Sequence, residues 1–104
     1  MRSARVYFHE TMAKAWDEAN RGSELPLDTR RDIRLAATHA ARSSMRAVDL
    51  MYNLGGGTSV YKSSPLQRIF RDVHVASQHM MVAPPTFELA GRLFLGQDAE
   101  LSTL

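Results

Sequence analysis

The sequence predicts an all-α fold, an antiparallel helical bundle, from three observations. Apolar residues recur every three or four positions through most of the 104 residues, which is the period of an amphipathic helix. Strict alternation of apolar and polar residues, the mark of a half-buried strand, is not found. Short segments rich in Gly, Pro and Ser separate the periodic stretches and provide the turns. We expect helices at residues 3–21, 29–53, 65–82 and 86–95.

Length and composition indicate a single domain, residues 1–104. The chain is 44% hydrophobic and 23% charged, which is too apolar for a disordered protein. It has no cysteine, so disulfides and thiolate chemistry are excluded. The formal net charge is only +2, and no recognition motif accompanies the arginines, so we expect no nucleic-acid partner. No apolar run approaches the ~20 residues of a membrane span, and no leader follows Met1, so we expect no membrane partner and a cytoplasmic location.

The first expected helix, residues 3–21, has a natural stop at Gly22 but no capping residue at its start. We therefore expect the chain to be part of a longer protein. Asp28 or Thr29 is the expected cap of the second helix. That helix is rich in small residues, which allow close approach of a neighbouring helix at the short end of the ~8–10 Å range. They are Ala36, Ala37, Ala40, Ala41, Ser43, Ser44 and Ala47.

The third helix has the clearest start. Ser64 can serve as N-cap, Pro65 as the first helical residue, and Gln67 as the third residue of a capping box. Its apolar stripe comprises Leu66, Ile69, Phe70, Val73, Ser77, Met80 and Met81. At 100° per residue, His79 would lie with Arg68, Asp72 and Val75 on another, largely polar side. Pro84 ends this helix.

The last helix ends at Gly96, and the polar tail after it is expected to be loose. Of the four histidines, His74 would lie about 140° around the third helix from His79, so the pair cannot chelate one metal ion. His9 and His39 have no partner at ligand spacing. We expect no metal site.

Gly55, Gly56 and Gly57 precede the third helix and allow two interpretations. They can end the second helix as a C-cap, or they can let backbone N–H groups approach a phosphate closely. Neither a P-loop nor a Rossmann fingerprint is present, because no Gly-Lys-Ser/Thr follows and no strand precedes.

Residues 53–79 resemble the C-terminal helical domain of the acyl-CoA dehydrogenase superfamily, which contains a Q-x-x-G-G-x-G turn, a proline-led helix and an R-D pair. Asn53 takes the glutamine position, Gly56-Gly57 the glycine pair, Pro65 the proline and Arg71-Asp72 the R-D pair. The catalytic glutamate of the dehydrogenases would fall at Met80, and a methionine cannot abstract a proton. His79 is instead similar to the histidine of the flavin-dependent monooxygenase branch, the oxygenase components of two-component aromatic hydroxylases.

The resemblance implies a flavin-dependent monooxygenase that hydroxylates an aromatic or related substrate with O₂. It implies flavin contact by Asn53, Gly55, Gly56 and Gly57, with FAD and FMN both open, and catalysis by His79. A neutral imidazole could accept the substrate's phenolic or thiol proton. The implied partners are a flavin reductase and further copies of the chain as a homo-oligomer. Because another long helix and two further domains precede this point in the family, the resemblance also implies that residues 1–104 are a fragment of a longer enzyme, that the first helix of the bundle is missing, and that the isolated fragment is inactive. An FAD-dependent acyl-CoA dehydrogenase and a non-enzymatic oligomerisation module are the alternatives.

Overall fold

The computed structural model describes residues 1–22 and 24–104, and the elements in this part of the chain are all helical. Four α-helices follow in order: α1 (Arg2–Asn20), α2 (Leu27–Leu54), α3 (Pro65–Ala76) and α4 (Pro85–Phe94). Two short 3₁₀ helices join them, η1 (Gly56–Val60) after α2 and η2 (Met80–Val82) after α3. The all-α prediction is confirmed.

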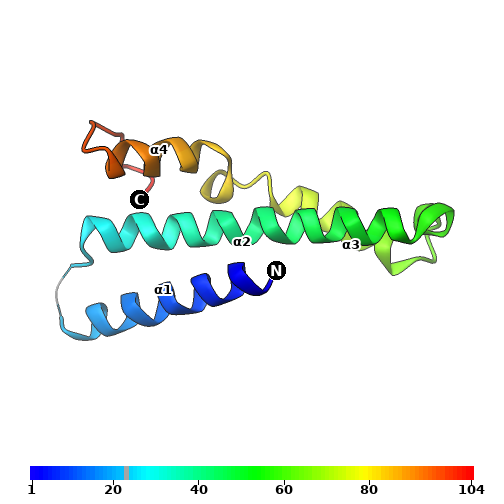
Figure 1. The fold of residues 1–104 in the computed structure, drawn as a ribbon, viewed down its shortest axis with the longest axis horizontal. Coiled ribbons are helices and arrows are strands. Elements are labelled where there is room, and N and C mark those ends of the chain that lie inside the picture. Colours follow the sequence, from blue (N-terminus) through cyan, green and yellow to red (C-terminus); the bar gives the residue numbers. More distant parts are fainter. Residues whose placement is uncertain (23) are drawn as a thin grey trace.

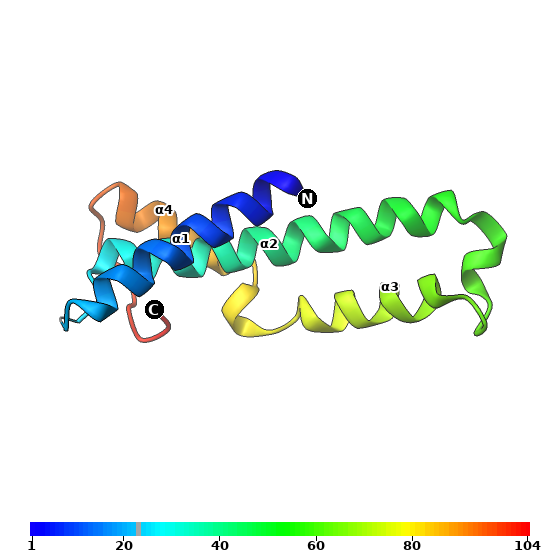
Figure 2. The same ribbon diagram turned by 90° about the horizontal axis from the view of Figure 1, so that it is seen from below.

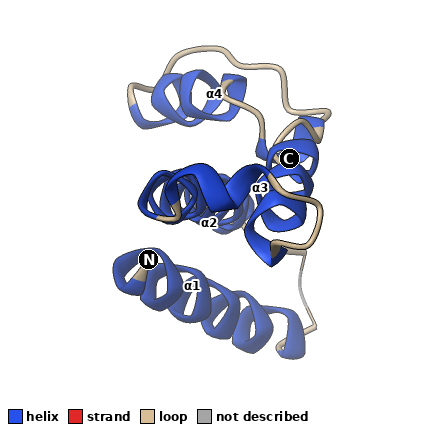
Figure 3. Cartoon of the chain, turned by 90° about the vertical axis from the view of Figure 1, so that its right-hand side faces the viewer, coloured by secondary structure: helices blue, strands red, loops and turns tan. Residues whose placement is uncertain are grey.

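The long helix α2 forms the axis of the molecule, and the other helices pack against it (Figure 1). All three run antiparallel to α2: α1 and α4 lie along its N-terminal half, and α3 returns along its C-terminal half (Figure 2). Seen along this axis, α1 and α4 lie on opposite sides of α2 while α3 lies beside it (Figure 3). The domain is therefore an open, three-sided arrangement around one helix rather than a closed bundle.

Glycines end two of the helices as predicted. Gly22 after α1 and Gly96 after α4 have φ of +78° and +65°, a left-handed conformation that favours glycine. At α4, the Gly96 and Gln97 amides donate to the carbonyls of Leu93 and Arg92, which is a Schellman motif. The tail beyond was expected to be loose, but it folds back on α2. Arg30 Nη2 donates to the Leu104 carbonyl at 2.7 Å.

The start of α2 differs from the prediction. Its N-cap is Pro26, and neither Asp28 nor Thr29 caps it. Pro26 has an extended backbone (ψ 149°), so the helix can begin at the next residue, and its carbonyl accepts the Arg30 amide at 3.0 Å. The Asp28 carboxylate binds Arg31 Nη1 at 2.8 Å instead of a backbone amide. Ser64 and Pro65 do occupy the N-cap and first positions of α3, although the Ser64 side chain makes no capping hydrogen bond.

The predicted helix over residues 65–82 is wrong beyond Ala76. Ser77 Oγ donates to the His74 carbonyl at 2.8 Å, and a hydroxyl that binds a nearby carbonyl competes with helix propagation. The following amides turn to shorter-range partners: Gln78 N–H donates to Val75 O and His79 N–H to Ala76 O. His79 then has an extended backbone, with ψ 131°, and is the N-cap of η2. It therefore does not continue the polar row of Arg68 and Asp72.

The chain buries few large apolar side chains by itself. Among the described residues, the buried hydrophobic ones are alanines: Ala4, Ala15, Ala36 and Ala90. The radius of gyration is 16.7 Å, whereas a compact domain of this length would have about 13 Å. Large apolar side chains are exposed on every helix, among them Trp16, Leu54, Ile69, Val75 and Phe94. The small residues of α2 do permit close packing, since Ala36 and Thr38 are fully buried. No helix in the described residues is long and apolar enough to cross a membrane.

Candidate functional site

The glycine turn closes the C-terminal end of α2. Gly55 is the C-cap, and its N–H donates to the Met51 carbonyl at 3.0 Å. Two hydroxyls then satisfy carbonyls at this helix end: Thr58 Oγ1 donates to Gly55 O at 2.7 Å, and Ser59 Oγ to Tyr52 O at 2.8 Å. The C-cap interpretation is therefore confirmed, with hydroxyl side chains of η1 completing the cap.

The three glycines differ in whether, and why, the structure requires a glycine. A Cβ on Gly55 would lie 2.1 Å from Ser59 Oγ and 2.9 Å from Leu66 Cδ1, so the space is already filled. Gly56 has φ +55°, a conformation that side chains disfavour. Gly57 has neither constraint, because its Cβ would meet nothing within 4 Å and its φ lies outside the left-handed region. Packing within the described chain does not explain a glycine at this position.

The backbone at Gly56 and Gly57 is exposed, as is Asn53 one turn earlier on α2. Bare backbone of this kind lets an anionic group approach N–H groups without side-chain hindrance. Gly55 differs, since it is half-buried against Ser59 and Leu66. Of the four predicted flavin-contacting residues, Asn53, Gly56 and Gly57 thus offer an accessible surface, while Gly55 supports it from within.

His79 lies outside α3, exposed, at the head of η2. Its Nδ1 accepts the Met81 N–H at 3.2 Å. A neutral imidazole carries one proton, so this hydrogen bond places the proton on Nε2. Nε2 then presents an N–H donor at the free edge of the ring, while Nδ1, the acceptor nitrogen, is already bound to the Met81 N–H.

The glycine turn and His79 lie at opposite ends of α3 (Figure 2). The 12 residues of this helix separate them, which is about 18 Å at 1.5 Å per residue. The chain therefore does not gather its predicted site residues into one pocket. They could contact only distant parts of one extended cofactor, or two different cofactor molecules.

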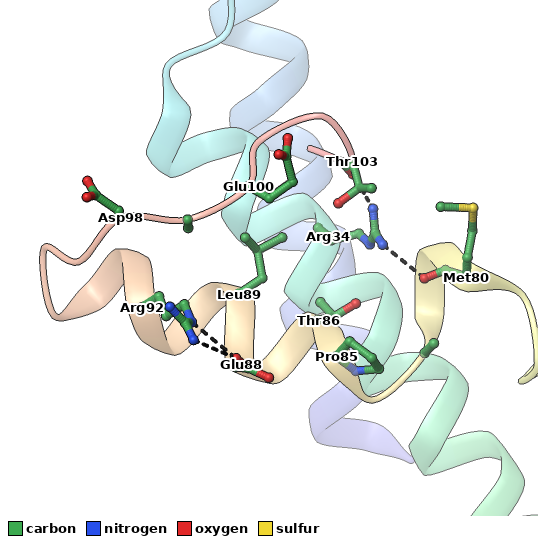
Figure 4. A pocket seen from close by; sticks show the side chains of 12 residues that line it. Arg34, Met80, Pro85, Thr86, Glu88, Leu89, Arg92, Asp98, Glu100 and Thr103 are labelled. Carbon is green, nitrogen blue, oxygen red and sulfur yellow. Dashed lines mark hydrogen bonds and ion pairs between the residues drawn. The ribbon is translucent and has the colours of Figure 1, made fainter.

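Arg34 of α2 holds the η2 segment in place (Figure 4). Its Nη2 donates to Met80 O at 2.9 Å, and its Nη1 contacts Met81 Sδ at 3.0 Å and the Thr103 carbonyl of the tail. The side chain is buried, and burial lowers the pKa of the guanidinium because it disfavours the charged form. The sequence analysis did not single out this residue, because nothing local marks one arginine among the several on α2.

Next to Arg34 is a hollow of about 660 Å³ between η2, α4 and the tail, which Figure 4 shows from close by. Leu89 and Met80 supply apolar lining, while Glu88, Arg92 and Glu100 supply charges of both signs. Glu88 pairs with Arg92 at 3.0 Å. The Ser102 amide holds the pKa of Glu100 below its usual range by hydrogen bonding to the carboxylate.

His74 has a partner that the sequence analysis missed. Its Nε2 lies 2.8 Å from Asp49 Oδ1 on α2. Its ring centroid lies 4.4 Å from that of Phe70, with the two rings tilted, and Phe70 in turn packs on Tyr52. The pair joins α3 to α2 across 25 residues of sequence. One signal was present: His74 is four residues after Phe70, so it shares the apolar side of the helix that faces α2.

The Arg71-Asp72 pair is exposed, and its ion pairs stay on its own helix. Asp72 lies 3.9 Å from Arg71 and 4.0 Å from Arg68. Exposed pairs of this kind contribute little to stability. Within the described part of the chain, no group of three His, Asp or Glu residues is arranged to hold a metal ion.

The described geometry is an all-helical domain, in which three helices run antiparallel to a long α2 that ends in a capped glycine turn. Comparison with known proteins gives its family: residues 1–84 match the family described as "Acyl-CoA dehydrogenase, C-terminal domain". The chain belongs to this family.

Three relatives carry names of oxygenating enzymes. The chain is 36% identical over 97 residues to indole-3-acetate monooxygenase of Pseudomonas putida, which is 93% of this chain and 25% of that protein. It is 31% identical over 101 residues to a pigment production hydroxylase of Rhodococcus erythropolis, covering 96% of this chain and 26% of that protein. A third relative is HsaA, the oxygenase subunit of a flavin-dependent monooxygenase of Mycobacterium tuberculosis. The chain is 29% identical to it over 58 residues, which is 56% of this chain and 15% of that protein. The chain spans about a quarter of the length of the first two relatives.

Proposed function

We propose that this chain is the C-terminal helical domain of a flavin-dependent monooxygenase that hydroxylates an aromatic or related small molecule. The observation that supports the proposal most is the match to an indole-3-acetate monooxygenase over 93% of the chain. The site agrees with it, because an exposed histidine, His79, stands beside Met80, where the resembling dehydrogenases have their glutamate. A bound reduced flavin would supply the two electrons that activate O₂, so that one oxygen atom enters the substrate and the other is released as water.

Flavin contact is proposed for the exposed backbone of Gly56 and Gly57 and for the Asn53 side chain, with Gly55 as their support. These groups suit the phosphate-bearing part of a flavin, since open N–H groups attract anionic oxygens. FAD and FMN both carry such a phosphate, and we propose either as cofactor, reduced by a separate reductase component. The exposed apolar faces of the helices support assembly into a homo-oligomer, in which a neighbouring copy would complete the flavin site.

His79 is proposed to act on the substrate side of the flavin, at the other end of α3. Because Nδ1 accepts the Met81 amide, the neutral ring offers its Nε2–H as a donor. We propose that this N–H binds a substrate or oxygen atom that gains negative charge during the transfer. The alternative role, acceptance of a substrate proton, would require the unprotonated nitrogen to leave the Met81 amide and turn outward.

Two substitutions of His79 in the full-length enzyme separate these roles. A glutamine side chain at this position places an amide N–H near that of Nε2, so His79→Gln should retain part of the oxygenation if the ring is a donor. His79→Ala should lower product formation by roughly 10²–10⁴-fold in either role. Hydroxylated product and hydrogen peroxide are both quantified per reduced flavin, and His9→Ala, on the exposed surface of α1, is the control. Equal losses in His79→Gln and His79→Ala would favour the proton acceptor.

A wild-type product yield in His79→Ala would show that His79 takes no part in the mechanism.

The class of enzyme is tested separately, by mixing acyl-CoA substrates with the oxidised flavoenzyme without oxygen. A monooxygenase should leave the flavin oxidised, and bleaching of the flavin by an acyl-CoA would overturn the proposed class in favour of a dehydrogenase.

A further inference from the structure

Arg34 is a buried arginine whose charge has no ion-pair partner among the described residues. It is 7% exposed, and no carboxylate pairs with it in the described part of the chain. Its Nε is buried without a hydrogen-bond partner among the described residues. Removing a charge from water is costly, and an apolar side chain of similar volume in such a place is often as stable or more so. The position and partners of the guanidinium therefore require another explanation.

The partner of Arg34 Nη2 is the carbonyl of Met80, at 2.9 Å. This carbonyl and the Met81 N–H belong to the same peptide unit. A trans peptide is planar, with its C=O and N–H pointing in opposite directions, so an anchor on one end sets the direction of the other. The Met81 N–H is the group that binds His79 Nδ1 at 3.2 Å. A single rigid unit thus links the arginine to the histidine ring.

The charge of Arg34 adds to this geometry. A cation that binds a carbonyl oxygen polarises the amide and strengthens its N–H as a donor, as in other hydrogen-bonded chains. Thr38, fully buried one turn further along α2, supports the same segment with its hydroxyl 3.5 Å from Met81 O. Met80 and Met81, by contrast, have exposed side chains that give η2 little packing of its own.

We propose that Arg34 is the positioning residue for His79, acting through the Met80–Met81 peptide to hold the imidazole in its Nε2–H form and orientation. This assignment rests on the proposed function, in which His79 acts on the substrate. An arginine suits the task because its planar fork holds two acceptors at once, here Met80 O and the Thr103 carbonyl. A lysine has one ammonium on a flexible stem and cannot fix both.

The test uses the full-length enzyme with Arg34→Met, and Arg30→Met as the matched control. Arg30 lies one turn earlier on α2 and binds the tail at Leu104 O but not η2. Arg34→Met should lower product per reduced flavin by about 10²-fold, the scale of a small misplacement of a reacting group. Flavin affinity should stay unchanged, and the lost product should appear as hydrogen peroxide. Arg30→Met should match the wild type.

A double-mutant cycle with His79→Ala decides whether Arg34 acts through the histidine. If it does, Arg34→Met should cause no further loss in the His79→Ala background. Additive losses, or an Arg34→Met variant that equals Arg30→Met, would overturn the assignment. A His79→Ala variant with wild-type yield would instead refute the proposed function, and the Arg34 assignment with it.

A second readout does not depend on turnover. NMR of the protein with ¹⁵N-labelled histidine reports which ring nitrogen carries the proton. The His79 signal is the one that disappears in His79→Ala, and in the wild type it should show a protonated Nε2 and an unprotonated Nδ1. Arg34→Met should shift this signal toward a mixture of both tautomers, and Arg30→Met should not. If Arg34→Met does not fold, Arg34→Lys keeps the charge and should show the same shift to a smaller degree. An unchanged tautomer in the folded Arg34 variant would overturn the assignment.

Discussion

Alanine substitutions at the three consecutive glycines should give three different results, because Gly55 is constrained by packing, Gly56 by its positive φ, and Gly57 by neither. In Gly55→Ala the new Cβ would lie 2.1 Å from Ser59 Oγ and 2.9 Å from Leu66 Cδ1. Ser59 is fully buried and donates to Tyr52 O at 2.8 Å, so it must move and lose that bond. The lost hydrogen bond costs about 1 kcal/mol and the overpacking about 1–3 kcal/mol. We expect Gly55→Ala to destabilise the fold by about 2–4 kcal/mol, the sum of these two costs.

The other two substitutions should cost less. Gly56→Ala forces a side chain into φ +55°, at about 1–2 kcal/mol. Gly57→Ala meets no atom within 4 Å, and its effect on stability should lie within about 0.5 kcal/mol. Thermal unfolding of the full-length apoprotein measures the series. The double variant Gly55→Ala with Ser59→Ala should recover part of the loss, because the Oγ that clashes is gone.

The same series tests the flavin contact. If the open backbone at Gly57 binds a phosphate, Gly57→Ala should weaken flavin binding about 10-fold or more with the fold intact, measured by titration of flavin fluorescence. Gly56→Val would be a poorer probe, because a β-branched residue at positive φ also strains the cap. Wild-type flavin affinity in Gly57→Ala would mean that the turn is a helix cap and nothing more. A Gly55→Ala variant as stable as Gly57→Ala would refute the steric argument.

Two further predictions concern packing and association. Asp49→Ala removes the partner of His74, and since both side chains are partly exposed, stability should fall by only about 1 kcal/mol. Flavin binding should not change, and denaturant unfolding with a parallel flavin titration checks both. The 104-residue chain by itself should self-associate, because large apolar side chains are exposed on every helix. Light scattering over a range of concentrations tests this, and a stable monomer at high concentration would contradict it.

Most helix boundaries followed from local chemistry and could be predicted. Gly22 and Gly96 stop their helices because a left-handed residue is needed there, and Pro65 starts α3 because its missing N–H has no partner at that position anyway. These effects lie within a few residues of sequence. The glycine turn was likewise recognisable as both a cap and an open backbone.

The end of α3 and the geometry of His79 were not predictable in the same way. The apolar period continues through Met80 and Met81, so the pattern alone extends the helix to Pro84. The helix stops earlier because the Ser77 hydroxyl takes the His74 carbonyl and because Arg34, 46 residues away in sequence, holds Met80 O in a different turn. A contact at that distance leaves no local periodic signal.

By itself, then, the sequence determined the helical class, the glycine stops of α1 and α4, the proline start of α3, and the presence of a histidine next to the position where the resembling dehydrogenases have a glutamate. These depend on residue type and on short-range spacing. Only the tertiary structure decided that His74 pairs with Asp49, that Arg34 holds the Met80 carbonyl, and that the space beside Gly55 is filled by Ser59 and Leu66. The reason is physical: each of these outcomes depends on which atoms the folded chain places beside one another, and the two pairs with Asp49 and Arg34 join α2 to segments 25 and 46 residues away.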